Sequence, residues 1–297
     1  MTGFDRHSER PSGLSLLGIE GEVAEEVGDL RDRERVRAAV RAARPDAVFH
    51  LAAQAIVGSA LESPVPTFRA NVEGTWNVME AARTEEVARV VVASSDKAYG
   101  PHVDLPYREG AALQPIYPYD VSKAAADMIA RSYWHTYELP VAVTRFANIY
   151  GGGDLNFSRL VPEAVTAVLD GRRPVIRSDG TPERDFLYVE DVASAYLAIA
   201  AALERGEARG EALNAGWGSP NSVREVVELV CELAGSEVRP DIRGQGNPAG
   251  EIDRQYLDAT RIRRLTRWAP RVELRDGLAR TLDWYREHSD VRPPPAG

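Results

Sequence analysis

The chain has 297 residues, with 36 Lys and Arg against 45 Asp and Glu and a net charge of −9. This acidic balance argues against a nucleic-acid partner, which requires a basic stripe. The single cysteine, Cys231, excludes an internal disulfide and a cysteine zinc cluster and fits a reducing cytoplasm. No apolar run approaches the roughly 18 residues of a membrane span. Residues 1–7 lack the apolar core of a signal peptide. We therefore expect a cytoplasmic protein with no nucleic-acid or membrane partner.

Short apolar runs alternate with amphipathic helical stretches in the first half of the chain. Residues 47–53, 88–94 and 141–148 are predicted strands, and helices are expected at about 33–44, 64–83 and 119–137. This alternation predicts a parallel sheet covered by helices on both faces. Because ligands bind at the carboxyl ends of such strands, the polar residues that follow each strand are candidate site residues.

The second half of the chain is less regular. Helices are expected at about 160–170, 191–205 and 222–234, with a short strand at 212–215, a loop at 244–250 and two closing helices. Asp191 and Ser222 are residue types that cap helix N-termini, and we expect them to be N-caps. Residues 292–297, rich in proline, are expected to be a frayed tail.

The beginning of the chain departs from the pattern of a dinucleotide-binding fold. Such a fold opens with a strand, a glycine-rich turn and a helix whose N-terminus carries the pyrophosphate. The nearest glycines, Gly13, Gly18, Gly21 and Gly28, do not follow a strand at the required spacing. Residues 3–5 instead resemble the end of the second strand of such a fold, and residues 28–32 the end of the third.

We therefore expect the first strand, the glycine-rich turn and the first helix to be missing from this sequence. Because the first strand is central in the order 3-2-1-4-5-6, its loss predicts a gap in the middle of the sheet. We interpret this as a sequence that starts downstream of the true start or has been shortened. Loss of cofactor binding is the alternative.

Tyr119 and Lys123 lie one helical turn apart on the same face of a predicted helix. A nearby cation lowers the pKa of a phenol, so that the phenolate can take the proton of a substrate hydroxyl. Only two of the 36 basic residues are lysines, Lys97 and Lys123, and an ammonium can shift its pKa where a guanidinium cannot. A surface pair on a helix is the alternative.

Four polar residues, Ser94, Ser95, Asp96 and Lys97, lie where the predicted strand at 88–94 ends. Polar side chains at the end of an apolar strand are costly unless they face a polar cleft. Ser95 is placed to hydrogen-bond the oxygen that Tyr119 deprotonates, and Asp96 and Lys97 add an acid–base pair. A solvated turn is the alternative.

Five motifs occur in the order found in one enzyme family. They are His-Leu-Ala-Ala-Gln from residue 50, Asn-Val-Glu-Gly-Thr from 71, Tyr-Asp-Val-Ser-Lys from 119, Arg-Phe-Ala-Asn-Ile-Tyr-Gly from 145 and Arg-Asp-Phe-Leu-Tyr-Val-Glu-Asp from 184. With them the chain resembles, over about residues 5–288, the extended short-chain dehydrogenase/reductases of the nucleotide-sugar epimerase/dehydratase group. The Ser95-Asp96-Lys97 segment and residues 151–162 are most similar to CDP-glucose 4,6-dehydratase.

The resemblance implies an α/β fold, with a Rossmann-like doubly wound parallel sheet and a smaller α/β substrate domain. The NAD-binding domain would comprise residues 1–157 and about 186–214, and the nucleotide-sugar-binding domain about 158–185 and 215–297. It also implies a homodimer formed through the helices at about 64–83 and 119–137. Neither the resemblance nor the spacing of the histidines indicates a metal site.

The resemblance also implies the site residues. The catalytic residues would be Tyr119, Lys123, Ser95, Asp96 and Lys97. The NAD contacts would be Asp5, Asp29, Leu30, Leu51, Ala52, Ala53, Gln54, Asn71, Ser94, Tyr119, Lys123, Phe146 and Ile149. The nucleotide-diphosphate sugar would contact Asn148, Arg159, Leu160, Arg184 and Arg254, where arginine forks suit two phosphate oxygens.

The reaction implied is a 4,6-dehydration through a transient 4-keto sugar. Tyr119 would remove the O4 proton, Lys97, at the position usually given to Glu, would remove the C5 proton, and Asp96 would protonate the departing 6-hydroxyl. One alternative is an NAD-dependent nucleotide-sugar 4-epimerase, against which the Asp96-Lys97 pair argues. Another is a truncated, cofactor-free remnant that binds a nucleotide sugar or a partner subunit without catalysis.

Overall fold

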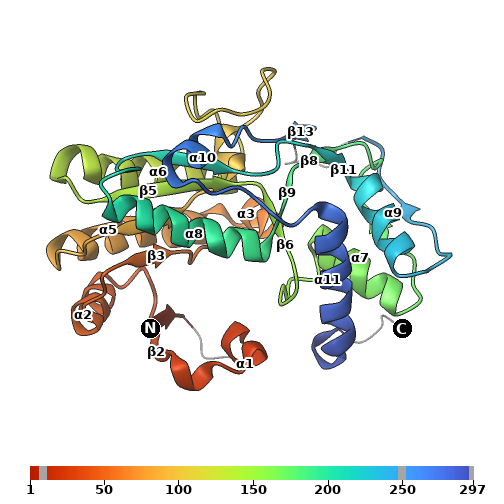
Figure 1. Cartoon of the computed structure of the whole chain (residues 1–297), viewed down its shortest axis with the longest axis horizontal. Helices are drawn as coiled ribbons and strands as arrows, with labels where there is room; N and C mark the ends of the chain where they lie inside the picture. Colours follow the sequence, from red (N-terminus) through yellow and green to blue (C-terminus); the bar gives the residue numbers. More distant parts are fainter. Residues whose placement is uncertain (7–11, 247–251, 294–297) are drawn as a thin grey trace.

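The computed structural model describes residues 1–6, 12–246 and 252–293 (Figure 1). The α-helices are α1 (Gly13–Leu17), α2 (Arg33–Ala43), α3 (Val57–Glu62), α4 (Pro64–Phe68), α5 (Gly74–Thr84), α6 (Pro118–Tyr137), α7 (Leu160–Leu169), α8 (Val189–Glu204), α9 (Val223–Leu233), α10 (Thr260–Thr266) and α11 (Leu274–Glu287). The strands are β1 (Thr2–Asp5), β2 (Ala24–Val27), β3 (Val48–His50), β4 (Val90–Ala93), β5 (Val141–Phe146), β6 (Asn148–Tyr150), β7 (Val175–Ile176), β8 (Glu183–Arg184), β9 (Phe186–Tyr188), β10 (Ala212–Ala215), β11 (Asn221–Ser222), β12 (Asp241–Ile242) and β13 (Arg254–Gln255).

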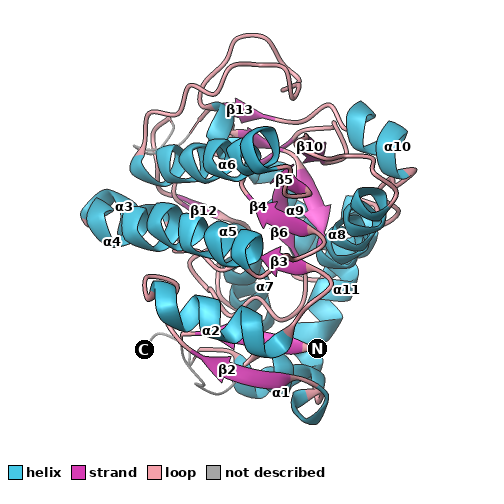
Figure 2. Ribbon diagram, turned by 90° about the vertical axis from the view of Figure 1, so that its left-hand side faces the viewer, coloured by secondary structure: helices cyan, strands magenta, loops and turns pink. Residues whose placement is uncertain are grey.

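A parallel sheet with strand order β10-β5-β4-β3 forms the centre of the molecule. Its inner strands are almost entirely apolar, and Val90, Val91 and Val92 are 0% exposed because helices cover both faces. Figure 2 shows α5 and α6 on one side of this sheet and α8 on the other. The predicted α/β fold with a Rossmann-like parallel sheet is confirmed.

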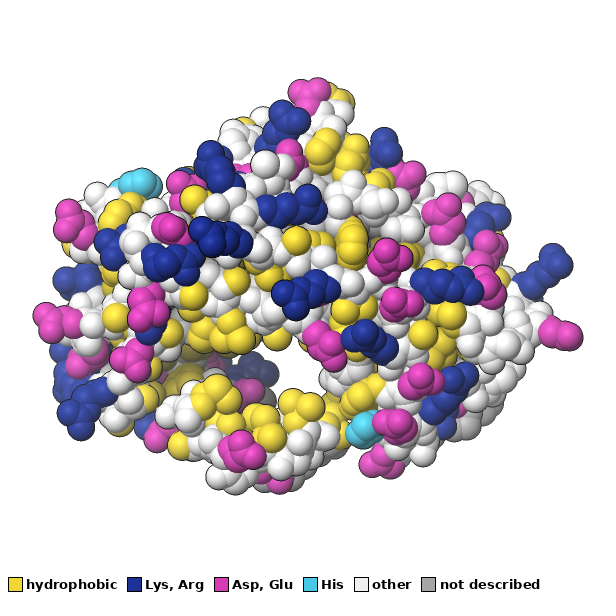
Figure 3. All heavy atoms as spheres, viewed as in Figure 1, with side chains coloured by type: hydrophobic (Ala, Val, Ile, Leu, Met, Phe, Trp, Pro, Cys, Tyr) yellow, Lys and Arg dark blue, Asp and Glu magenta, His cyan; other side chains and the backbone are white. Residues whose placement is uncertain are grey.

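The gap predicted in the sheet is also confirmed. Strands β1 and β2 pair in parallel as a separate two-stranded sheet, and among the described residues no strand lies between β1 and β3. Helix α2 packs on α5, and Val36, Val78 and Ala81 form a small cluster that Phe4 and Val48 also contact. Figure 3 shows an opening between the segment that holds β2 and α1 and the main body of the molecule.

The helix expected at 64–83 is interrupted, which corrects that prediction. Helix α4 runs into a π-helical turn, η2 (Arg69–Glu73), before α5 begins at Gly74. A π-turn inserts one extra residue per turn and re-aims the side chains that it carries. Here it carries Asn71, which is buried and hydrogen-bonded to the candidate site described below.

The strand expected at 141–148 is in fact two strands in different sheets. β5 ends at Phe146, and Asn148 starts β6, which pairs in parallel with β9. The chain thereby leaves the central sheet and enters a second hydrophobic cluster, built from α7, α9, α11, β6 and β9. Figure 1 shows these elements together at one end of the molecule. The division into two domains at the residues given above stays a prediction.

The two expected N-caps differ in outcome. Ser222 caps α9 in a reciprocal capping box with Glu225, as predicted. The prediction for Asp191 was wrong, because α8 already begins at Val189 and has Tyr188 as its N-cap. The Asp191 carboxylate instead accepts the backbone N–H groups of Arg271 and Val272, which ties α8 to the segment before α11.

The described part of the chain ends before the predicted tail is complete. Residues 294–297 of that tail, and residues 247–250 of the loop expected at 244–250, lie outside the described residues. No helix in the described ranges is long and apolar enough to span a membrane.

A buried ion pair joins α6 to β5. The Arg145 guanidinium donates to both carboxylate oxygens of Asp127, at 2.8 and 3.0 Å, and neither side chain is more than 1% exposed. We expect Asp127→Ala to lower the free energy of unfolding by about 3–5 kcal/mol, because it leaves a buried cation unpaired. Urea unfolding of Asp127→Ala, with the double variant Asp127→Ala/Arg145→Met as control, tests this. The double variant should regain part of the loss, and a single-variant loss below about 1 kcal/mol would contradict the prediction.

Candidate active site at the carboxyl end of strand β4

Three elements bring the predicted catalytic side chains together. Ser95 follows β4, Asp96 and Lys97 lie in the 3-10 turn η3 (Asp96–Tyr99), and Tyr119 and Lys123 lie in the first turns of α6. Residues 95–99 form this turn because the Ser95 hydroxyl accepts the backbone N–H of Lys97, at 3.2 Å. α6 begins with Pro118 at its first position, which presets the helical backbone angle.

The Ser95 side chain interacts with the Tyr119 phenol and acts on its pKa. Burial raises the pKa of Tyr119 to about 12, with the negative charge of Asp96 adding to the shift and the Ser95 hydrogen bond opposing it. We expected the Lys123 cation to lower this pKa, and the structure shows the opposite direction. The physical reason is that desolvation and a nearby carboxylate both favour the neutral phenol.

The Lys123 ammonium is buried and donates to the backbone carbonyl of Ala93, at 2.8 Å. Burial lowers the pKa of Lys123 to about 8. A second hydrogen bond joins the same two segments: the Ser94 hydroxyl donates to the backbone carbonyl of Lys123, at 2.9 Å. These contacts join the end of β4 directly to α6.

Asp96 is only 3% exposed, and burial raises the pKa of its carboxyl. The charges of Lys97 and Arg184 and a hydrogen bond from Ser95 at 3.1 Å oppose this shift. A carboxyl with a raised pKa can hold a proton and donate it. The site therefore contains a second acid beside the phenol of Tyr119.

Asn71 holds the loop after β3 against α6. Its side-chain oxygen accepts the Gln54 N–H at 2.7 Å, and its amide nitrogen donates to the Gln54 carbonyl and to the Ser122 hydroxyl. His50 is buried at the end of β3 and bonded to Thr75, and burial and the Lys123 charge lower its pKa to about 3. Leu51 and Ala52 are exposed, and Ala53 is half-buried. Asn71 thus ties this loop to the helix that carries Tyr119, and the predicted NAD contacts of residues 51–54 stay a prediction.

The residues predicted at the adenine end of a cofactor lie on the separate β1–β2 unit. Asp5 is exposed at the end of β1. Asp29 follows β2 and accepts two bonds from the Arg31 side chain, which lowers the pKa of Asp29 to about 2. Leu30 packs against the cluster that joins α2 to α5.

The predicted substrate residues lie on β6, at the start of α7 and on the neighbouring strands β8 and β13. Asn148 and the 44%-exposed Ile149 are in β6, with the buried Phe146 ahead of them. Arg159 is the N-cap residue of α7, which starts at Leu160, and Arg159 pairs with Asp154 at 3.0 Å.

Arg184 is the buried arginine of this set. It is 7% exposed, and its charge acts on the Asp96 carboxyl. Arg254, on the neighbouring strand β13, is half-exposed, pairs with Glu183 and lies over the Tyr256 ring. Of the two, only Arg184 is linked by its charge to the catalytic cluster.

Two further buried polar residues, Tyr107 and Gln255, were not selected from the sequence, and Tyr107 lies near Asp96. Tyr107 donates to the Gly100 carbonyl at 2.7 Å, and the charges of Asp96 and Arg184 both act on it. Gln255 is 0% exposed and directly follows Arg254. The sequence signal for Gln255 was its position next to Arg254, which the sequence analysis had selected. Nothing in the sequence pointed to Tyr107.

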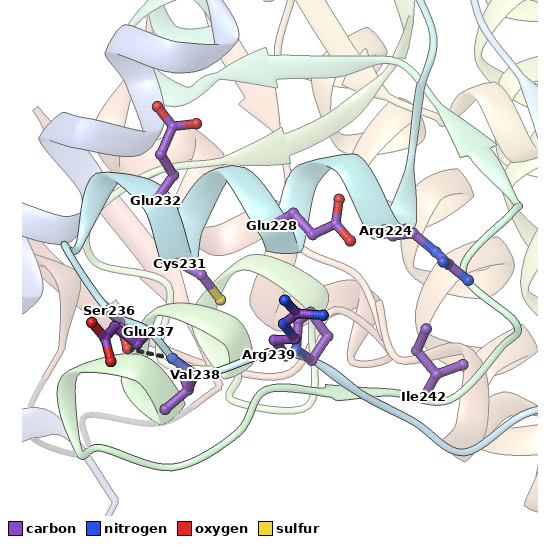
Figure 4. A pocket seen from close by; sticks show the side chains of 10 residues that line it. Arg224, Glu228, Cys231, Glu232, Ser236, Glu237, Val238, Arg239 and Ile242 are labelled. Carbon is purple, nitrogen blue, oxygen red and sulfur yellow. Dashed lines mark hydrogen bonds between the residues drawn. The ribbon is translucent and has the colours of Figure 1, made fainter.

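A cavity of about 530 Å³ lies elsewhere, along α9 and the segment before β12. Figure 4 shows its lining side chains, among them Arg224, Glu228, Cys231 and Arg239. It includes none of the predicted site residues, and burial raises the pKa of the Cys231 thiol, which makes that thiol less reactive. Within the described ranges, no group of three or more His, Cys, Asp or Glu side chains is placed to hold a metal ion.

Comparison with known proteins places this chain in a family. The model of the NAD dependent epimerase/dehydratase family matches residues 5–216. A dTDP-glucose 4,6-dehydratase of Streptomyces griseus is 36% identical over 260 residues, which covers 85% of this chain and 76% of the relative. The human dTDP-D-glucose 4,6-dehydratase is 30% identical over 266 residues, 88% of this chain and 74% of that protein.

Solved structures agree in fold. UDP-glucose 4-epimerase of Thermotoga maritima, solved with UDP-glucose, has a TM-score of 0.89 and 26% identity, covering 97% of this chain and 91% of its own. A dTDP-glucose 4,6-dehydratase of Streptomyces venezuelae, solved with NAD bound, has a TM-score of 0.86 and 29% identity, covering 97% and 88%. The strand order, the tyrosine–lysine helix and these similarities together lead to one conclusion: the chain belongs to the NAD-dependent epimerase/dehydratase family of extended short-chain dehydrogenase/reductases.

Proposed function

We propose that this chain is an NAD-dependent nucleotide-sugar 4,6-dehydratase, with CDP-glucose as the predicted substrate. The observation that supports it is the buried Asp96 carboxyl with its raised pKa, at the same strand end as Tyr119. Dehydration needs an acid for the departing 6-hydroxyl in addition to the group that deprotonates O4. The similarity to dTDP-glucose dehydratases supports the reaction class.

The described residues fit NAD at two of its three parts. Tyr119 and Lys123 lie together at the end of β4, where a nicotinamide would meet the sugar, and Asp5 lies exposed at the end of β1, where it would hold the adenine ribose. The pyrophosphate is not matched, because no glycine-rich turn that leads from a strand into a helix occurs among the described residues. NAD, when bound, supplies a reversible hydride acceptor.

Each catalytic side chain then has one task. Tyr119, in its phenolate form, takes the O4 proton while Ser95 hydrogen-bonds the same oxygen. Lys97 removes the C5 proton, which the 4-ketone makes acidic, and Asp96 protonates the 6-hydroxyl as it leaves. Lys123 positions the reacting end of α6 through the Ala93 carbonyl.

Arg184 and Arg159 are proposed to bind the diphosphate of the substrate. Arg184 is buried beside Asp96, and the Arg159 charge acts on Tyr119, so both cations act at the catalytic cluster. A guanidinium binds two phosphate oxygens at once. Arg254 stays a weaker third candidate, and like Arg159 it is paired with a carboxylate, that of Glu183.

The proposal is tested by calorimetry with NAD⁺ and by product analysis. Binding is compared between this chain and a version with a strand, glycine-rich turn and helix joined ahead of Met1. We expect the longer version to bind and to release a product one water lighter from CDP-glucose, with dTDP-glucose and UDP-glucose as comparison substrates. Absence of NAD⁺ binding by both versions would overturn the proposal and favour the cofactor-free remnant.

We expect Asp96→Asn to abolish loss of water while NAD⁺ binding persists, because an amide cannot supply the proton. The expected decrease in dehydration is about 10²- to 10⁴-fold. Mass spectrometry of the product, with the exposed Asp104→Asn as control, measures this effect. Unchanged loss of water would remove Asp96 from the mechanism.

The second candidate is a nucleotide-sugar 4-epimerase. Its specific support is the TM-score of 0.89 with a UDP-glucose 4-epimerase. An epimerase returns a sugar of unchanged mass, so product mass separates the two reactions. A product one water lighter than the substrate would exclude the 4-epimerase reaction.

Homodimerisation and a cytoplasmic location stay predictions. Trp76 on α5 and Met128 and Tyr137 on α6 are 46, 63 and 55% exposed, which supports an interface on these helices. Light scattering tests homodimerisation, and a monomer at working concentration would refute it.

A further inference from the structure

A carboxylate already holds one of the two arginines proposed for the substrate diphosphate. Arg159 donates from Nη1 to the Oδ2 of Asp154 at 3.0 Å, and 46% of the Arg159 side chain is exposed. The charge of Arg159 also acts on the Tyr119 phenol, so the paired guanidinium lies within electrostatic range of the catalytic cluster. An anion that binds at this cluster therefore meets an arginine that already has a partner.

The loop between β6 and α7 brings Asp154 to Arg159 through two successive tight turns. The Asn156 N–H donates to the Oδ1 of Asp154 at 3.0 Å, and the Ser158 N–H donates to the Oδ1 of Asn156 at 3.1 Å. Asp and Asn side chains form such turns because they accept the backbone N–H two residues further along the chain. The chain thereby folds back, and the second oxygen of Asp154 meets a side chain five residues away.

Helix α11 anchors the same loop. The buried Tyr285 donates its hydroxyl to the backbone carbonyl of Asp154, and Gly152 lies so close to the Trp284 ring that no side chain fits between them. Figure 1 shows α11 beside α7, against which it packs. The backbone of Asp154 is therefore held in place, whereas the long side chain of Arg159 has many rotamers. An exchange of partners must come from movement of the Arg159 side chain.

The Asp154 carboxylate and a diphosphate compete for the same guanidinium. Both are oxyanions, and both accept N–H groups from one planar fork. Arg159 is also the N-cap residue of α7, its side chain makes no capping bond there, and the N-terminus of a helix favours an anion. A carboxylate carries a single negative charge and a diphosphate more than one, so the diphosphate can displace Asp154 from an exposed, weak ion pair.

We propose that Asp154 occupies Arg159 when no substrate is bound, and that the substrate diphosphate must displace Asp154 before Arg159 can bind it. Asp154 thereby sets the affinity for the diphosphate without contact with the reacting atoms. The affinity is lowered by the fraction of molecules in which Arg159 is paired, because only the unpaired form is ready to bind. This inference rests on the proposed function in one respect, that Arg159 binds the diphosphate.

The test is a double-mutant cycle on the binding of CDP, dTDP and UDP, measured by calorimetry on the full chain. The variants are Asp154→Asn, Arg159→Gln and both together. Asparagine keeps an oxygen for the Asn156 N–H and removes the charge that holds Arg159. We expect Asp154→Asn to tighten the binding of the nucleoside diphosphate about two- to sixfold, the range that follows from the strength of exposed ion pairs. In the Arg159→Gln background this gain should fall below about 1.5-fold.

Asp283→Asn is the matched control. It removes the same charge from another exposed aspartate–arginine pair, in which Asp283 contacts Arg286 at 2.8 Å and Arg286 is 46% exposed, like Arg159. Binding of the nucleoside diphosphate to this control should equal that of the parent. The urea midpoint of Asp154→Asn should also equal that of the parent, which separates a change in affinity from a change in folding.

A gain in affinity that requires Arg159 supports the proposal. An equal gain with and without Arg159 overturns it, because Asp154 would then act on the ligand directly by charge repulsion. Unchanged or weaker binding by Asp154→Asn overturns it as well, and if Arg159→Gln still weakens binding, the diphosphate role of Arg159 stands. Binding by Arg159→Gln equal to that of the parent, or no binding of any of the three nucleotides, rejects that role and this inference together, while the mass of the product tests 4,6-dehydration separately.

Discussion

Tyr119→Phe is expected to lower turnover by about 10²- to 10⁴-fold and to leave the fold intact. Phenylalanine keeps the ring in place and removes only the hydroxyl that takes the O4 proton. The hydroxyl interacts with the Ser95 side chain, so the structural cost is at most that of one hydrogen bond, about 1 kcal/mol. NAD⁺ and nucleotide-sugar binding should therefore persist. Turnover is measured on the NAD⁺-binding form of the protein.

Tyr137→Phe is the matched control for this variant. It makes the same change on the same helix, at a side chain that is 55% exposed at the other end of α6. Its turnover should equal that of the parent. A Tyr119→Phe variant that turns over within a factor of a few of the parent would show that another group accepts the proton.

Lys123→Met is expected to abolish turnover and at the same time to stabilise the protein at pH 7. Burial lowers the Lys123 pKa from 10.5 to about 8, so the charged form costs about 3 kcal/mol in the folded state. The variant also loses the hydrogen bond to the Ala93 carbonyl, and this loss offsets about 1 kcal/mol of the stability gained by removing the buried charge. The net expected gain is about 1–2 kcal/mol by urea unfolding.

The same shift predicts how this difference depends on pH. Because the folded pKa is depressed, the contribution of Lys123 to stability is fully present above pH 10.5 and is lost as pH falls through about 8. Between these values the unfolded chain holds a proton that the folded chain has released. The stability of the parent should therefore rise relative to that of Lys123→Met as pH rises from 8 to 10.5. An equal difference in unfolding free energy at pH 8 and at pH 10.5 would contradict the prediction.

Local sequence was sufficient for most of the elements and for the spacing of Tyr119 and Lys123 in the candidate site. Alternation of apolar strands and amphipathic helices gave the parallel sheet, because each signal depends only on neighbouring residues. The four-residue spacing of Tyr119 and Lys123 placed both side chains on one face of α6 for the same reason. The missing glycine-rich turn predicted the opening beside β3, which the strand order then confirmed.

Only the tertiary structure decided how these side chains are used. Lys123 donates to the Ala93 carbonyl and Tyr119 has a raised pKa, because burial and the position of Asp96 depend on packing between β4 and α6. The change from β5 to β6 after Phe146 and the π-turn around Asn71 likewise depend on contacts with distant segments. Sequence patterns report periodicity along the chain, whereas desolvation, charge neighbours and strand pairing arise only when remote segments meet.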